Sequence, residues 1–280
     1  MLRDGRTFYA VLFKTEEDIL RMPALSKLFP AELVQWDDAT STKRCADGTI
    51  VARHGIYLSE KQYSSDPNFL EHGYDKKRRA YRYNFYILRY SSPKDTAPLY
   101  ILASPFKRLA ARIFRHLTTV EQLEYTYQRV KLAKLLAGVD ELVTASPRLS
   151  VPMVDFYVYG DGGSEDVKIS GSDPMKSKVY RALNSLTQAR SASDRIDIAP
   201  CSVILALDFQ SEEPTTIEIY FKGILSCPWK KDLSHLNDLA VALNALQKRG
   251  LIEETSVRPN WMTESRAKAL LGTIPEYDHE

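Results

Sequence analysis

The sequence predicts an α+β fold built from hairpin-then-helix (ββα) units in two subdomains. Stretches with strand-like alternation lie beside stretches with helical spacing, one hairpin-then-helix order recurs, and a polar segment divides the chain near its middle. The recurrence is clearest where each helix is expected to begin, with a small or polar residue, Pro, a large apolar residue and Lys, as in Ser104–Lys107, Asp173–Lys176 and Cys227–Lys230. Because Pro suits the first helical position in general, repeated helix capping explains this pattern better than an internal duplication does.

The N-terminal subdomain is expected to span residues 1–145. Alternating apolar and aromatic residues favour strands, the spacing i, i+3, i+4 favours helices, and Gly after a polar residue favours turns. The expected elements are, in order, a strand over Thr7–Phe13, a helix over Glu16–Phe29 interrupted at Pro23, short strands with turns at Asp47-Gly48 and His54-Gly55, strands over Arg79–Tyr90 and Pro98–Ala103, and helices over Pro105–Leu117 and Val120–Ala137.

The segment from Val139 to Pro152 contains Gly, Ser, Pro and charged residues, which predicts a linker. Beyond it, residues 146–280 are expected to form the C-terminal α+β subdomain. Its expected elements are strands over Met153–Tyr159, Asp166–Ile169, Cys201–Phe209 and Ile217–Leu225, and helices near Pro174–Leu186, Asp232–Arg249 and Thr263–Leu271.

Composition and charge place limits on the class of protein. The three cysteines are widely spaced, which disfavours a disulfide framework or a zinc site, and no apolar run approaches the length of a membrane helix. A cytoplasmic protein without membrane contact is therefore expected. The net charge of +2 is unevenly distributed: residues 70–134 hold fourteen Lys and Arg against five Asp and Glu, so this segment carries +9 and the remainder −7. That asymmetry favours an anionic partner for one region of the molecule.

The predicted helix from Pro105 to Leu117 carries cations on one side. Apolar residues recur with helical spacing and form a single face, and no acidic residue lies between Pro98 and Val120. The opposite side carries Lys107, Arg108, Arg112, Arg115 and His116. Like charges on one stripe repel, and the helix dipole disfavours cations in the first turn, so this arrangement favours a bound phosphate. The alternative is a solvated face whose acidic neighbours come from elsewhere in the fold.

A second basic segment lies just upstream, at Lys76, Lys77, Arg78, Arg79 and Arg82. It leads into an aromatic strand in which Tyr81, Tyr83 and Phe85 share one face by alternation. Such an arm could hold a nucleic-acid backbone while aromatic rings stack on bases. The alternatives are that the aromatic residues belong to the core and that the basic run is a solvated loop or a localisation signal.

Motifs of enzymes are largely absent from the sequence. It has no GxxxxGK[ST], GxSxG, HExxH or GxGxxG pattern, and no cofactor is expected. One acid–acid–lysine set, Asp208, Glu218 and Lys222, could hold Mg²⁺ and orient a water for phosphodiester cleavage. A pair of surface residues on an edge hairpin is the alternative, because three residues separate the glutamate from the lysine. No catalytic or metal-binding residue is therefore assigned.

In layout the chain resembles the phage exclusion proteins of the RexA type. The opening Phe8-Tyr9-Ala10 strand and the hairpin over Val154–Ile169, followed by a helix, carry the resemblance, which covers most of the chain. No diagnostic motif matches, so no functional residue is transferred. The resemblance implies a DNA-binding, homodimeric, two-domain protein that acts in phage exclusion.

The sequence thus favours a non-catalytic protein that binds nucleic acid, with duplex DNA favoured, through phosphate contacts with little reading of bases. Two other hypotheses stay open. One is a metal-dependent nuclease that uses Asp208, Glu218 and Lys222. The other is a protein-interaction module whose basic half docks on an acidic surface.

Overall fold

A computed structural model describes most of the chain up to residue 255. The described residues are 7–21, 25–29, 32–45, 48–63, 73–92, 97–119, 123–160, 163–171, 173–188, 197–208, 214–220, 223–228 and 235–255. The helix predicted over Thr263–Leu271 lies outside them. None of the helices in this part of the chain is long and apolar enough to cross a membrane.

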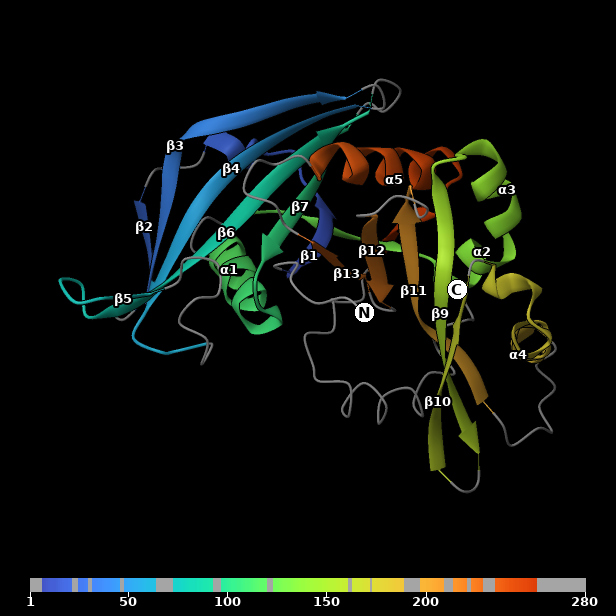
Figure 1. Cartoon of the computed structure of the whole chain (residues 1–280). Coiled ribbons are helices and arrows are strands. Elements are labelled where there is room, and N and C mark those ends of the chain that lie inside the picture. Colours follow the sequence, from blue (N-terminus) through green and yellow to red (C-terminus); the bar gives the residue numbers. More distant parts are fainter. Residues whose placement is uncertain are drawn as a thin grey trace.

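The described strands form one sheet, which Figure 1 shows running through the whole molecule. Its main path has the order β10-β9-β11-β12-β13-β1-β7-β6-β4-β3-β2, while β5 pairs with β6, and β8 pairs with β1 and β14. All of the pairings are antiparallel. The strands are β1 (Thr7–Lys14), β2 (Leu25–Phe29), β3 (Glu32–Cys45), β4 (Gly48–Ser59), β5 (Gly73–Asp75), β6 (Ala80–Ser91), β7 (Leu99–Ser104), β8 (Thr126–Val130), β9 (Leu149–Gly160), β10 (Gly163–Ser170), β11 (Asp197–Leu207), β12 (Thr215–Tyr220), β13 (Ile224–Pro228) and β14 (Ile252–Thr255).

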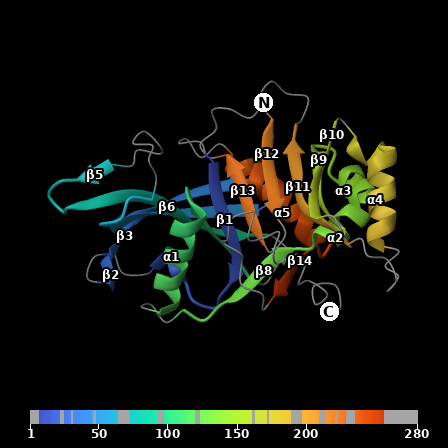
Figure 2. The same ribbon diagram turned by 90° about the horizontal axis from the view of Figure 1, so that it is seen from below.

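Helices cover both faces of this sheet, and two apolar clusters fill the space beneath them. The larger cluster lies on the face covered by the helices that follow β8, and the smaller one lies under α1 on the other face. Figure 2 shows α1 lying beside β1, and α3 and α4 gathered beyond β9 at the other end of the sheet. The helices are α1 (Lys107–Thr119), α2 (Leu132–Ala137), α3 (Val139–Ala145), α4 (Lys178–Gln188) and α5 (Leu236–Lys248), with short 3-10 turns η1 (Ile19–Arg21) and η3 (Pro174–Lys176).

The side chains of β6 show why one strand serves both clusters. Successive residues of a strand point to opposite faces. Tyr83, Phe85 and Ile87 accordingly pack under α1, whereas Leu88 and Tyr90 belong to the larger cluster. A strand that is apolar on both faces lies in the interior of a sheet, and β6 is indeed flanked by β4 and β7.

The predicted α+β arrangement of ββα units is wrong. The structure is mainly one antiparallel sheet with few helices, and the hairpins that precede α1 and α4 are parts of that sheet rather than of separate units. Local patterns predicted several of the hairpins and helices but none of the long-range pairings. In particular, β1 pairs with β13, more than two hundred residues away, and this pairing joins the strands of both halves of the chain.

Several local predictions also fail. The segment expected as a linker forms α3 and the start of β9, with Val139 and Leu142 buried. The helix expected over Val120–Ala137 is a strand followed by a short helix, and the segment expected as a helix over Glu16–Phe29 contains η1 and β2. The division at residues 145 and 146 falls between α3 and β9, and two independently stable subdomains stay a prediction.

Gly55 explains one failed turn prediction. The His54-Gly55 pair was expected to form a turn, but it lies in the middle of β4, where Gly55 is opposite Phe85. The Phe85 ring lies across the position that a Cβ of Gly55 would occupy. This glycine therefore serves a close approach within the sheet, which is a recurring role of glycine inside strands.

Candidate nucleic-acid interface

Helix α1 is fixed to the sheet by the apolar face that its sequence predicts. Leu109, Ile113 and Leu117 are fully buried. The Phe114 ring packs edge-on against Phe13, with ring centroids 5.1 Å apart. Because this face packs on the sheet, the opposite side of the helix points away from the sheet. The cationic residues were expected on that opposite side.

The outer side of α1 contributes to an open hollow of about 340 Å³, here called the basic hollow. Its lining includes four cations and one phenol, and it includes no carboxylate among the residues that the structure describes. The lining residues are Lys61, Tyr63, Arg108, Ala111, Arg112 and Arg115. Three of them are the arginines predicted from the helical stripe, and the structure adds Lys61 and Tyr63 from the segment after β4.

Buried hydroxyl groups hold the segment that carries Lys61 and Tyr63. The hydroxyl of Tyr83 donates a hydrogen bond to the carbonyl of Lys61 at 3.1 Å and accepts one from the backbone N–H of Tyr63. The side chain of Ser59 accepts a bond from the N–H of Lys61 at 3.1 Å. Burial raises the pKa of Tyr83 above its ordinary value, so this hydroxyl stays protonated and keeps its donor. The backbone beside α1 is therefore held before any ligand arrives.

The electrostatics of the basic hollow favour an anion. The first turn of α1 contains no acidic residue, so its free N–H groups and the positive end of its dipole are not balanced by a side chain of that turn. Arg108 and Arg115 are exposed and Arg112 is partly buried. His116, expected on the exposed side, is instead fully buried. The side chain of Lys107 is not among those described.

The tetrabasic run forms the turn between β5 and β6, where Lys76, Lys77, Arg78 and Arg79 are all exposed. Asp75 shapes this turn, because its carboxylate accepts hydrogen bonds from the backbone N–H groups of Lys77 at 2.9 Å and Arg78 at 3.1 Å. Figure 1 shows the turn projecting from the sheet, away from α1. The predicted arm is therefore an ordered hairpin.

Arg82 differs from the other predicted cations. It is exposed, but it alternates with Tyr81 and Tyr83, whose side chains lie on the α1 face. Arg82 consequently points to the opposite face of β6. Eight of the nine predicted residues thus fall into three places: three line the basic hollow, four form the hairpin turn, and Arg82 lies on the far face of the sheet.

The predicted acid–acid–lysine set is not brought together by the described residues. Glu218 lies opposite Ile204, whereas Asp208 follows Leu207, which lies opposite Thr215. The two carboxylates are therefore separated by roughly 13 Å along the strands. Lys222 lies outside the described residues.

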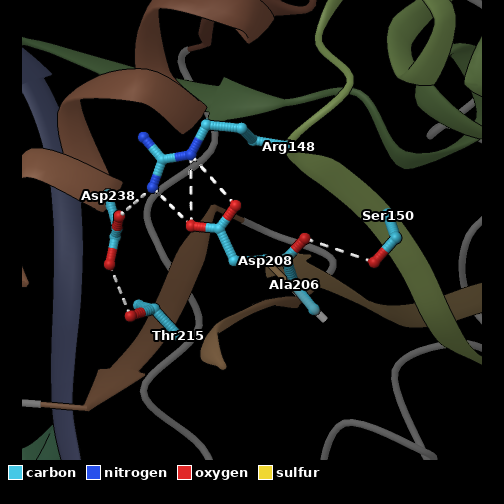
Figure 3. Close-up of polar contacts among 6 residues, drawn as sticks. All are labelled: Arg148, Ser150, Ala206, Asp208, Thr215 and Asp238. Atoms are coloured by element: carbon cyan, nitrogen blue, oxygen red, sulfur yellow. Dashed lines mark hydrogen bonds and ion pairs between the residues drawn. The ribbon is translucent and has the colours of Figure 1, made fainter. Parts of the chain in front are cut away.

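Asp208 instead belongs to an ion-pair network that joins the residue before β9 and the residue after β11 to α5 (Figure 3). Arg148 donates to both carboxylate oxygens of Asp208, at 3.1 Å and 2.6 Å, and to Asp238 at 3.0 Å. These hydrogen bonds hold the pKa of Asp208 below its ordinary value. Asp238 also accepts a bond from Thr215 at 2.6 Å. The network ties the start of α5 to strand ends, which is a structural role.

Sequence reasoning missed Lys61 and Tyr63. The segment Glu60–Tyr63 shows neither helical spacing nor a charge run, and it follows a strand that was predicted only as short pieces with a turn at His54-Gly55. Its role arises because β4 and β6 pair directly, so that Tyr83 can reach the backbone beyond the end of β4. That kind of contact leaves no local signal in the sequence.

Comparison with known proteins does not assign the chain to a family. No family model matches the chain, and no curated protein is significantly similar to it. The similarity in layout to phage exclusion proteins of the RexA type stays a hypothesis from the sequence.

Proposed function

We propose that this protein binds nucleic acid without cleaving it, with duplex DNA as the favoured ligand, and that the basic hollow contacts the phosphate backbone. The observation that carries the proposal is the gathering of Lys61, Arg108, Arg112 and Arg115 around one open hollow. Cations at such a surface bind phosphates by releasing condensed counterions, so their contribution does not depend on base sequence.

The shape of the surface supports backbone contacts rather than base reading. Helix α1 lies with its apolar side against the sheet, so its outer side contributes to an open basic surface. Specific reading of duplex DNA places an exposed helix or ribbon in the major groove. The hairpin turn at residues 76–79 is the second cationic surface that we assign to phosphate contacts.

The test is a salt titration of binding to a short duplex, with single-stranded DNA and RNA of the same sequence measured in parallel. In the triple variant Arg108→Gln, Arg112→Gln, Arg115→Gln, each lost phosphate contact should flatten the slope of log affinity against log salt by about one unit. Folding should change little, because Arg108 and Arg115 are exposed and Arg112 is only partly buried, and exposed polar substitutions shift stability by about 0.5 kcal/mol or less each.

A matched control removes the same charge from elsewhere. Arg44, Lys178 and Arg181 are exposed on β3 and α4, and their replacement by Gln should leave both affinity and salt slope close to those of the wild type. If the wild-type protein binds no nucleic acid at low salt, the proposal is wrong and an interaction module takes its place. Equal losses of nucleic-acid affinity in the two triple variants would mean that binding depends on the net charge of the protein and not on the position of these arginines.

The resemblance to exclusion proteins extends the proposal to a homodimer that acts in defence against phage. Light scattering on the purified chain, with and without duplex, tests the dimer. Plating of phage on cells that do or do not carry the triple variant tests the defence role. A monomer at all concentrations would remove the dimer from the proposal and leave DNA binding untouched.

A further inference from the structure

A second group of polar side chains crosses the sheet in its C-terminal half, here called the carboxylate cluster (Asp155, Lys168, Ser202, Glu218 and Tyr220). The strand register brings it together: Asp155 of β9 lies opposite Lys168 of β10 on one side and Ser202 of β11 on the other, and Ser202 lies opposite Tyr220 of β12. Figure 2 shows these strands side by side. Glu218 precedes Tyr220 by two residues and so shares its face.

The carboxylate cluster lies on the same face of the sheet as α1. Its neighbours in sequence, such as Val154, Val203 and Ile219, point into the larger apolar cluster on the other face. The side chains of the carboxylate cluster must therefore point away from it. The two carboxylates stand close together, because Ser202 Oγ lies 3.4 Å from Asp155 Oδ2 and 3.1 Å from Glu218 Oε1.

The hydrogen-bond donors of the cluster do not saturate these carboxylates. A serine hydroxyl has a single hydrogen, so Ser202 donates to only one of its two carboxylate neighbours at a time. Tyr220 donates to Glu218 Oε2 at 2.5 Å, and Lys168 Nζ lies 3.4 Å from Asp155 Oδ2. Asp155 Oδ1 is buried and accepts no hydrogen bond from the described residues.

The environment makes this arrangement costly. Asp155 is only 8% exposed and Ser202 only 2% exposed. Two carboxylates held together in a poorly solvated place repel each other, and a buried acceptor without a partner loses its hydration without compensation. Burial raises the pKa of Asp155, the ion pair with Lys168 lowers it, and the charge of Glu218 raises it further.

We propose that Asp155 and Glu218 hold a divalent cation of the Mg²⁺ or Mn²⁺ class, with the unpartnered Asp155 Oδ1 as a ligand. Hard cations of this class prefer oxygen ligands, and Mg²⁺ is commonly held by one or two protein carboxylates while waters complete its shell. The side chain of Lys168 is 65% exposed, so its flexible stem allows the ammonium to move into solvent when a cation enters. A cation bound by both carboxylates cancels their repulsion, and Asp155 Oδ1 is the carboxylate oxygen of the pair that accepts no hydrogen bond from the described residues. This inference is independent of the basic hollow.

The first measurement is Mn²⁺ binding to the full chain, by calorimetry and by the rise in melting temperature relative to EDTA. Wild-type protein should bind Mn²⁺ and melt at a higher temperature, because a ligand that binds the native state stabilises it. Asp155→Asn and Glu218→Gln should each weaken Mn²⁺ affinity by more than about tenfold. Asp208→Asn is the matched control, because it removes a carboxylate already bound by Arg148 and should leave Mn²⁺ affinity unchanged.

The variant Lys168→Gln separates a cation site from a purely structural cluster. Removal of the competing ammonium should tighten Mn²⁺ binding, an effect that a structural role does not produce. It also keeps the test open if Asp155→Asn fails to fold. The proposal is overturned if the wild type shows neither calorimetric binding nor a melting shift with millimolar Mn²⁺ or Mg²⁺. Equal affinities in the wild type, Glu218→Gln and Asp208→Asn overturn it as well.

Discussion

The two halves of the sheet differ in the way their charged side chains are arranged. In the N-terminal half, Arg108, Arg112 and Arg115 gather with Lys61 around one hollow. In the C-terminal half, acids alternate with donors: Ser202, Tyr220 and Lys168 surround Asp155 and Glu218, and Arg148 lies between Asp208 and Asp238. Cations gathered at an open surface favour an anionic ligand, whereas the carboxylates of the C-terminal half lie beside hydrogen-bond donors of the chain itself.

The difference also separates two kinds of acidic residue. Asp208 is held by a bidentate arginine in a partly exposed place, so its carboxylate is fully used within the chain. Asp155 lies in a buried place with one oxygen unpartnered. A carboxylate with spare acceptors is the better candidate for a ligand, even though the sequence had directed attention to Asp208.

The largest expected effect tests whether α1 is a fixed platform for the basic hollow. Phe114→Ala should cost about 3–5 kcal/mol of unfolding free energy, because a buried aromatic ring is replaced by a cavity. Phe114 contacts the rings of Phe13, Tyr125 and Tyr127, with centroids 5.1, 4.7 and 5.2 Å away. Urea denaturation measures the change, and a loss below about 1 kcal/mol would contradict a fully packed site.

A smaller effect is expected when the basic hollow keeps its charges but loses the Tyr83 hydroxyl that holds the backbone of Lys61 and Tyr63. Tyr83→Phe removes the hydroxyl that binds Lys61 and Tyr63, which should cost about 1–3 kcal/mol of stability because buried partners lose their bond. DNA affinity should fall while the salt slope stays near that of the wild type, since no phosphate contact is removed. Tyr81→Phe is the control on the same face. Unchanged affinity in Tyr83→Phe would show that Lys61 needs no fixed position.

The ion-pair network of the C-terminal half should give a modest, pH-dependent effect. Asp208→Asn is expected to cost about 1 kcal/mol at neutral pH, as for partly exposed ion pairs. The pKa of Asp208 is lower in the folded state than in the unfolded state, so its stabilisation exists above the ordinary carboxyl range and is lost as pH falls through the folded pKa. The unfolding free energies of the wild type and of Asp208→Asn, measured by denaturation from neutral to acid pH, should therefore converge as the pH falls. Glu254→Gln, at an exposed position of β14, should show no such convergence.

The smallest expected effect concerns Arg82, which lies on the face opposite α1. Arg82→Gln should change the salt slope by much less than the unit expected for a lost phosphate contact. Arg108→Gln, measured in parallel, should flatten the slope of log affinity against log salt by about one unit. A full unit lost in Arg82→Gln would extend the interface to the opposite face of the sheet and weaken the distinction between the two faces.

Parts of the site could be predicted because they depend on local spacing. The apolar face of α1 follows from residues three and four apart, and the same spacing puts Arg108, Arg112 and Arg115 on the other side. His116 shows the limit of that reasoning. The helix was expected to expose it, but the surrounding sheet buries it completely.

The fold class could not be predicted in the same way. The alternation in β6, β9 and β11 indicates strands, but it does not say which strand pairs with which. The segment of β3 from Asp37 to Arg44 is polar, and β8 lies in a stretch whose spacing favours a helix, so neither strand was recognised. Each becomes a strand because a partner, β4 in one case and β1 in the other, offers a backbone to bind.

By itself the sequence determined the basic character of residues 70–134, the two-sided nature of α1 and the positions of many strands, since these are fixed by residue type and by short repeats along the chain. Only the tertiary structure decided that β13 lies beside β1, that Lys61 joins the arginines of α1, and that Asp155 meets Glu218 across Ser202. The physical reason is that strand pairing uses backbone groups common to all residues. Side chains far apart in sequence are therefore brought together by register, which no local pattern records.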